Sequence, residues 1–433
     1  MPCTNWGANW FLCHFNLKKL RPGFIPRRNR MKIKLLRKDR DSNPGTALDG
    51  HTLSRRASSA TRASFQLTDA NIVIFICKFA SLFNTSIQMY LFYSDYLEGC
   101  HPEILKKLSE TNLEQTPGYG VDDYCEAARN TIRNACSAPD ADVHFLVGGT
   151  QTNATVISSI LRPFQGVLCA DTGHINVHET GAIEHSGHKV LPLPAKDGKI
   201  TAAQVREAME AHYNDPSPEH MVQPAMLYIS YPTELGTLYS KKELVDIKKA
   251  CSDWEIPLYI DGARLGYGLE SEDSDLLLKD IAAIADLFYI GGTKQGALFG
   301  EALVIRKESL KKDFRYIIKT NGGMLAKGRL LGIQFSALFK DGLYFRIARN
   351  ADRLAGRIIG AFKDSGHKFL VENRTNQVFP ILEVEEYDRL SKEFGFEFWK
   401  KMDDEHVAVR FCTSWATTEE QVDALIAAIG KLD

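Results

Sequence analysis

Apolar runs of strand length alternate with amphipathic helical stretches from Met89 to about residue 340. The apolar runs occupy residues 143–147, 167–170, 189–193, 225–230, 257–260, 287–290 and 302–305. Helical patterns fit between them, for example over residues 201–212 and 241–254. Near-continuous apolar strands separated by helices are typical of a mostly parallel sheet with helices on both faces. The alternation therefore predicts an α/β fold.

The pattern changes after about residue 341. A long helical stretch over residues 344–363 is followed by short strands around 378–382 and 407–411 and by a closing helix over 419–432. Short strands mixed with helices predict a smaller α+β domain at the C-terminus. We therefore expect a large domain of residues 89–340 and a small domain of residues 341–433.

Residues 1–88 differ from the rest of the chain, because they show neither helical nor strand periodicity. Residues 1–64 contain 14 Lys and Arg against 3 Asp and Glu. This basic leader could be an organelle transit segment, a nucleic-acid-binding arm, or an upstream extension outside the native protein, with Met89 as the natural start. We favour the extension. A nucleic-acid arm would give salt-sensitive binding to DNA or RNA that disappears when the leader is removed.

Composition limits the class of protein. The chain has 433 residues, of which 44% are hydrophobic and 25% charged, as in ordinary globular proteins. Its nine cysteines contain no C-x-x-C pair, which argues against a zinc site or a disulfide scaffold and favours a reducing compartment such as the cytoplasm. The longest apolar run of the leader, residues 72–83, is shorter than the ~20 residues that span a bilayer. We expect no membrane anchor and no nucleic-acid partner.

Two of the expected strands end in side chains with complementary chemistry. Asp261 follows the run 257–260, and Lys294 follows the run 287–290 and a Gly-Gly-Thr segment. Taken singly, a lysine after a strand is usually a solvated loop charge. At the carboxyl edge of one parallel sheet, however, a carboxylate can keep a pyridine nitrogen protonated and a desolvated amine can form a Schiff base. The pair predicts a pyridoxal 5'-phosphate site.

Two earlier segments also follow expected strands. Gly148, Gly149 and Thr150 open a helix and offer N–H groups and a hydroxyl to a phosphate. His174 lies where an imidazole could stack on a pyridine ring and move protons near neutral pH. The spacing of His174 and His178 also resembles that of metal ligands. Without a further Cys or His cluster, a structural His178 is favoured over zinc, and we expect no metal.

Several motifs occur in a definite order along residues 89–433. They are Ser94-Asp95, Tyr119-Gly120-x-Asp122, Gly149-Thr150-x-x-Asn153, His174-Ile175 with Glu179-x-Gly181-Ala182, Asp261-Gly262-Ala263-Arg264 and Thr293-Lys294. In this order they resemble the threonine aldolase family, which belongs to the β-eliminating lyase group of fold-type-I pyridoxal-phosphate enzymes. The resemblance implies an aminotransferase-like fold with a mostly parallel central sheet.

The resemblance implies roles for the residues that match. Lys294 would carry the cofactor as a Schiff base, Asp261 would pair with the pyridinium nitrogen, and His174 would stack on the ring. Gly149 and Thr150 would bind the phosphate.

Further residues would hold the substrate. The resemblance implies that Arg264 helps to fix cofactor and substrate, and that Arg410, in the expected strand 407–411, clamps the α-carboxylate of an amino acid. A surface arginine on an edge strand is the alternative for Arg410. Ser94 is a second candidate donor to that carboxylate. Tyr119 lies in a segment that in such proteins builds the site across a dimer interface, so a homodimer or homotetramer is implied.

The implied reaction is retro-aldol cleavage of a β-hydroxy-α-amino acid, for example threonine to glycine and acetaldehyde. An arginine-held carboxylate would fix which bond at Cα breaks. Threonine aldolases usually carry a second histidine in a Glu-Asn-Thr-His-Asn segment, whereas residues 230–237 here read SYPTELGT. Glu234, or a water held by His174, is the candidate base in its place. β-Elimination and transamination on the same cofactor therefore stay open.

Overall fold

A seven-stranded sheet is the centre of the structure, a computed structural model that describes residues 89–432. In spatial order the strands are β2 (Asp142–Leu146), β8 (Glu301–Ile305), β7 (Leu287–Gly291), β6 (Leu258–Asp261), β5 (Gln223–Ser230), β3 (Gln165–Ala170) and β4 (Lys189–Leu193). β8 alone runs opposite to the other six strands of this sheet. The prediction of a mostly parallel sheet is confirmed.

Both faces of the sheet are buried, which explains the continuous apolar runs. Successive residues of a strand point to opposite faces, so Tyr259 and Ile260 of β6 belong to two different hydrophobic clusters. In β7, Phe288 lies in the cluster of Ile260, and Tyr289 lies in the cluster of Tyr259. A sheet enclosed in this way needs apolar side chains at nearly every strand position.

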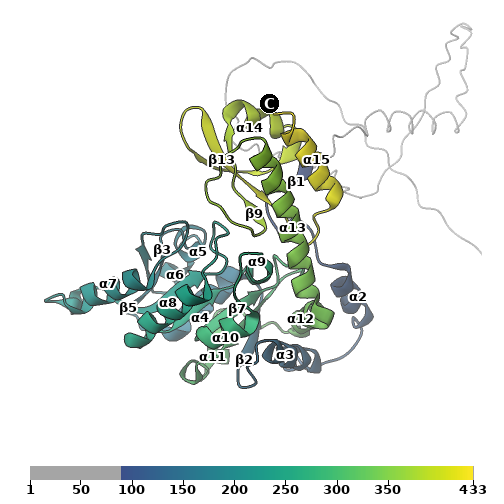
Figure 1. Cartoon of the computed structure of the whole chain (residues 1–433). Helices are drawn as coiled ribbons and strands as arrows, with labels where there is room; N and C mark the ends of the chain where they lie inside the picture. The colour runs from purple at the N-terminus through teal and green to yellow at the C-terminus, as the bar shows by residue number, and fades with distance from the viewer. Residues whose placement is uncertain (1–88, 433) are drawn as a thin grey trace, which may run out of the picture. The chain divides into compact units, whose positions relative to one another are not determined.

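Helices cover each face (Figure 1). One face packs against α3 (Asp123–Ala135), α7 (Ala202–Tyr213), α8 (Lys241–Asp253), α10 (Leu278–Ile284) and α12 (Arg329–Phe339). The other packs against α4 (Gly149–Ile160), α5 (His174–Val177), α6 (Ala182–His185) and α11 (Phe314–Thr320). The helices expected near residues 201 and 241 begin after Thr201 and Ser240, whose side chains form capping boxes. The α/β class is confirmed.

A smaller four-stranded sheet is formed by strands that follow α13 (Leu343–Asp364) in the chain. This helix is the long one expected over residues 344–363. Its central strand β13 (His406–Cys412) pairs antiparallel with β9 (Gln377–Val378), β10 (Ile381–Glu383) and β12 (Glu397–Lys401). The single strand expected around 378–382 is two strands, because Pro380 between them lacks the N–H that a ladder requires.

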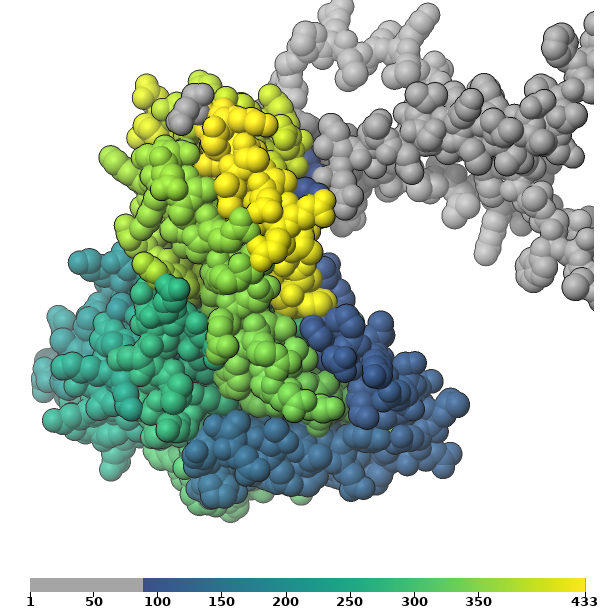
Figure 2. Space-filling model, turned by 45° about the vertical axis from the view of Figure 1, so that its right-hand side comes forward, coloured from purple at the N-terminus to yellow at the C-terminus, as the bar shows by residue number. Residues whose placement is uncertain are grey.

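The first described residues join this smaller sheet region. β1 (Tyr90–Leu91) pairs with β11 (Phe394–Gly395), and Phe92 lies in the same hydrophobic cluster as α13 and α15 (Glu419–Ile429). The chain then continues to α2 (Pro102–Glu110), which contacts α12. Figure 2 shows α15 in yellow lying along the green α13.

Some predictions concern residues beyond this description. The basic leader, residues 1–88, lies outside the described residues. The boundary near residue 340 stays a prediction. In the part of the chain that the structure describes, no helix is long and apolar enough to cross a membrane.

Candidate active site

A cavity of about 350 Å³ opens at the carboxyl ends of β5, β6 and β7. Seven residues predicted from the sequence line it, namely Gly149, Thr150, His174, Glu234, Asp261, Arg264 and Lys294. They lie at or shortly after the carboxyl ends of five different strands, and the parallel arrangement brings these ends to one edge of the sheet.

Asp261 is the last residue of β6 and accepts four hydrogen bonds. Tyr228 and Asn153 donate to Oδ2 at 2.6 and 3.1 Å, and the Tyr289 hydroxyl and Ala263 N–H donate to Oδ1 at 2.5 and 3.0 Å. Four donors therefore satisfy the carboxyl oxygens of a side chain that is buried. This arrangement suits a group that must stay negative beside a ring cation.

A polar chain connects Asp261 to His174. Asn153 donates from Nδ2 both to Asp261 and, at 2.7 Å, to Glu179 Oε1. The same Glu179 oxygen lies 2.8 Å from His174 Nδ1, and the Tyr259 hydroxyl donates to Asn153 Oδ1 at 2.8 Å. Glu179 therefore fixes the orientation of the imidazole at the cavity wall.

Lys294 follows β7 through Gly291, Gly292 and Thr293. Its backbone carbonyl accepts a hydrogen bond from the Tyr267 hydroxyl at 2.6 Å. Burial, and then the positive charge of Arg264, lower the pKa of the Lys294 amine. A lowered pKa raises the fraction of neutral amine that can attack an aldehyde.

The ends of β6 and β7 approach too closely for ordinary side chains. A Cβ at Gly262 would lie 2.0 Å from the Tyr289 carbonyl oxygen, and one at Gly291 would lie 2.2 Å from the Ala263 carbonyl oxygen. Glycine at these two positions allows Asp261 and Lys294 to face one cavity.

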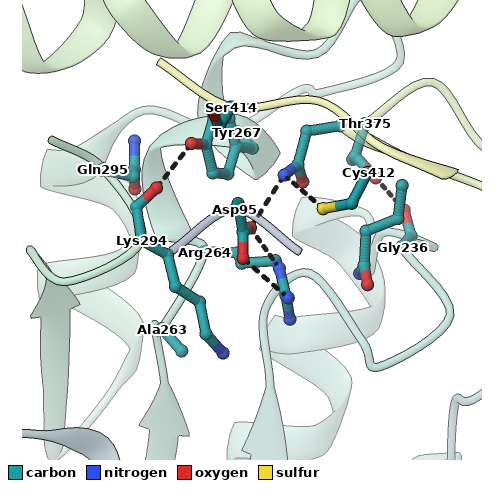
Figure 3. Close-up of polar contacts among 12 residues, drawn as sticks. Asp95, Gly236, Ala263, Arg264, Tyr267, Lys294, Gln295, Thr375, Cys412 and Ser414 are labelled. Carbon is teal, nitrogen blue, oxygen red and sulfur yellow. Dashed lines mark hydrogen bonds and ion pairs between the residues drawn. The ribbon is translucent and has the colours of Figure 1, made fainter. Parts of the chain in front are cut away.

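Arg264 is held by a buried ion pair with Asp95 (Figure 3). Its Nε donates to Asp95 Oδ2 at 2.7 Å and its second nitrogen donates to Oδ1 at 3.0 Å, while Asn376 donates to Oδ2 at 2.8 Å. Burial alone would raise the pKa of Asp95, but the charges of Arg264 and Lys294 lower it. The pair ties the segment before α2 to the loop after β6.

Glu234 lies in the loop after β5 and lines the cavity. Ser230 Oγ donates to its Oε1 at 2.6 Å, and the backbone N–H of His174 donates to the same oxygen at 2.8 Å. Burial raises the pKa of Glu234. A carboxylate with a raised pKa is a better general base than an ordinary surface glutamate.

Three predicted residues do not line the cavity within this chain. Arg410 pairs with Glu397 on the neighbouring strand β12 and donates to Gln377 Oε1 at 3.1 Å. Ser94 is buried beside Asp95. Tyr119 is 47% exposed, and the Lys319 amine lies 4.8 Å from the centre of its ring.

The sequence interpretation missed other groups that the structure brings to this site. Tyr228 and Tyr289 lie on expected strands, where the sequence pattern indicates only core residues. Glu301 also lines the cavity, and it directly precedes the expected strand at 302–305. The sequence feature that could have identified Glu301 is an acidic residue directly before a fully apolar run.

Comparisons with known proteins identify the family. The family model described as Beta-eliminating lyase matches residues 92–384. A solved structure titled a threonine aldolase of Leishmania major is 42% identical, covers 79% of this chain and 99% of its own, and superposes with a TM-score of 0.77. The chain therefore belongs to the beta-eliminating lyase family.

Two further relatives extend the comparison. A protein named low specificity L-threonine aldolase from Pseudomonas sp. (strain NCIMB 10558) is 29% identical over 79% of this chain and 97% of its own length. A mutant aspartate aminotransferase of Thermus thermophilus is 15% identical, covers 87% of this chain and 100% of its own, and has a TM-score of 0.60. The latter likeness shows the fold alone, and it confirms the predicted fold-type-I architecture.

Proposed function

We propose that the protein is a pyridoxal-phosphate-dependent lyase that cleaves β-hydroxy-α-amino acids, with threonine giving glycine and acetaldehyde. The observation that carries the proposal is that Lys294 and Asp261 line one cavity. The relatives named threonine aldolases support the choice of reaction.

The residues present fit this cofactor. Lys294 would form the covalent link, and Asp261 would pair with the pyridinium nitrogen. Gly149 and Thr150, at the start of the twelve-residue helix α4, would bind the phosphate. A Cβ at Gly149 would lie 3.0 Å from the Tyr289 hydroxyl, so glycine keeps this cradle open. When bound, the cofactor supplies an electron sink for the pair left at Cα when a bond there breaks.

The other residues would orient the substrate and move its protons. His174, held by Glu179, would stack on the ring. Glu234, or a water held by His174, would accept the proton of the β-hydroxyl, since Glu234 lines the cavity and its carboxyl accepts two hydrogen bonds. Arg264 would help to fix cofactor and substrate.

The α-carboxylate of the substrate would be held by Arg410, with Ser94 as a second donor. Binding there requires Arg410 to turn from its ion pair with Glu397 towards the cavity. Tyr119, exposed in the single chain, would contribute to the site of a second copy in a homodimer or homotetramer.

We also propose that residues 89–340 form the cofactor-binding domain and residues 341–433 the small domain. A cytoplasmic location agrees with the six free cysteines of the described residues.

Product analysis with purified, cofactor-supplied protein tests the reaction. L-Threonine and L-allo-threonine are expected to give equal amounts of glycine and acetaldehyde, and Lys294→Ala is expected to abolish both. The unusual segment around Glu234 favours β-elimination or transamination as the second candidate. Elimination would give a keto acid and ammonia, and transamination would require a keto-acid acceptor. A cofactor-loaded protein that releases no aldehyde would refute aldolase activity.

A further inference from the structure

Glu301 lies between the two segments that would hold the cofactor. It is the first residue of β8, where its register partners are Leu146 of β2 on one side and Gly291 of β7 on the other. Two residues after Leu146 the cradle of Gly148 to Thr150 begins, and three residues after Gly291 comes Lys294. The Glu301 side chain is 4% exposed and lines the same cavity.

The Glu301 carboxyl is bonded to the segment that leads to Lys294. Gly292 N–H donates to Oε2 at 3.0 Å, and Thr293 Oγ1 lies 2.8 Å from Oε1. Thr293 Oγ1 also accepts the N–H of Gly300 at 3.0 Å. The protonation state of Glu301 thus determines to which group the Thr293 hydroxyl can donate its one hydrogen bond.

These heavy-atom positions fit two arrangements of hydrogen. If Glu301 is ionised, it accepts a hydrogen bond from the Thr293 hydroxyl, and its negative charge lies beside the cavity. If Glu301 is protonated, its O–H can donate to Thr293 Oγ1 while its other oxygen still accepts from Gly292. The Thr293 proton is then free to point into the cavity, which Thr293 also lines.

The surroundings favour the protonated form near neutral pH. Burial raises the pKa of Glu301 to about 8, and the nearby charge of Asp261 acts in the same direction. The hydrogen bonds from Thr293 and Gly292 and the charge of Lys294 oppose this rise. The titratable groups that interact electrostatically with Glu301 are Lys294, Asp261, Tyr259, Tyr289 and Tyr344.

We propose that protonated Glu301 is a positioning residue that turns the Thr293 hydroxyl into the cavity, where it becomes a further donor to the cofactor phosphate. The inference rests on the proposed function, because it requires the phosphate to bind between Thr150 and Thr293. A neutral acid in this position avoids the repulsion that an ionised carboxylate would exert on a phosphate dianion.

The experiment compares the affinity of cofactor-free protein for pyridoxal phosphate and for pyridoxal, which lacks the phosphate. The affinity for pyridoxal phosphate divided by the affinity for pyridoxal gives a ratio that measures the contribution of the phosphate. The titration of Lys294 affects the binding of both ligands and therefore cancels in this ratio. Thr293→Val is expected to reduce the ratio about tenfold or more, as for a hydrogen bond to a charged group, and Thr293→Ser is expected to restore it.

The Glu301 variants test the positioning role. In Glu301→Gln the carbonyl can accept from Gly292 and the amide can donate to Thr293, so the ratio is expected to stay within about threefold of the unmodified protein. Glu301→Ala is expected to reduce it about tenfold. Between pH 7 and 9.5 the ratio should fall for the unmodified protein, as Glu301 ionises, and stay level for Glu301→Gln.

The outcomes separate this inference from the proposed function. If neither aldehyde gives a borohydride-reducible adduct at Lys294, the proposed function fails. If the adduct forms but Thr293→Val leaves the ratio unchanged, or Glu301→Gln loses as much as Glu301→Ala, the positioning role of Glu301 is overturned. A ratio in the unmodified protein that stays level to pH 9.5 also overturns it.

Discussion

The hydroxyl of Tyr228 on β5 donates to Asp261 on the adjacent strand β6 at 2.6 Å, and both side chains are buried. This bond is one of the four that the carboxyl group accepts beside a cavity that would hold a cationic ring. Tyr228 contributes to the proposed cofactor site without lining the cavity itself.

Tyr228→Phe is therefore expected to weaken cofactor binding about tenfold, because a hydrogen bond to a charged group contributes about 1.5–3 kcal/mol. Titration of cofactor-free protein with pyridoxal phosphate, followed by absorbance, measures the change. Tyr259→Phe is the matched control, since that equally buried hydroxyl donates to Asn153 and not to Asp261. Equal losses in the two variants would contradict the role of Tyr228.

Glu234→Gln is expected to abolish aldehyde release while cofactor absorbance is retained. The two donors to Glu234 use the same oxygen, Oε1, so the glutamine carbonyl can accept both. Because the base must be ionised, kcat of the unmodified protein should fall as pH decreases through a pKa above the usual 4.5. Glu184→Gln, at an exposed site, is the control and should retain activity.

Glu234→Gln is expected to leave the stability at pH 7 unchanged or to raise it, although it abolishes activity. A folded-state pKa above the unfolded value means that Glu234 favours folding at low pH and loses this contribution as pH rises through the folded-state pKa. At pH 7 the variant should have a Tm equal to or above that of the unmodified protein. A marked fall in Tm would show that the Glu234 carboxylate stabilises the fold.

Gly291→Ala is expected to destabilise the protein by about 2 kcal/mol or more, because the new Cβ would lie 2.2 Å from a backbone oxygen and the ends of β6 and β7 would have to separate. Gly356→Ala in α13 is the control, since its Cβ would have no neighbour within 4 Å. That change should stabilise the helix by about 1 kcal/mol. Urea unfolding of both variants measures the difference.

Asp95→Asn is expected to destabilise the protein by about 3–5 kcal/mol at pH 7, because it leaves Arg264 buried without its anionic partner. Folding lowers the pKa of Asp95, so its contribution is complete above the unfolded pKa and disappears as pH falls through the folded value. The difference between variant and unmodified protein should therefore shrink below about pH 4. Asp246→Asn, which removes the exposed pair with Lys242, should change stability little.

The class of fold and seven residues of the cavity lining could be predicted from the sequence. Period and length of the apolar runs identified all seven strands of the large sheet, because strands buried on both faces must be continuously apolar. Asp261, Lys294 and Gly149 could be placed together from sequence because each follows a strand, and parallel strands end at one edge.

The contacts that give these residues their properties depend on the tertiary structure. The bond from Tyr228 to Asp261, the ion pair between Asp95 and Arg264, and the position of Glu301 between two strands join residues far apart in the chain. Local sequence pattern encodes which face a side chain occupies, but not which residue of a neighbouring strand it meets. Strand order and register set those distances, and burial then sets the charge of each group.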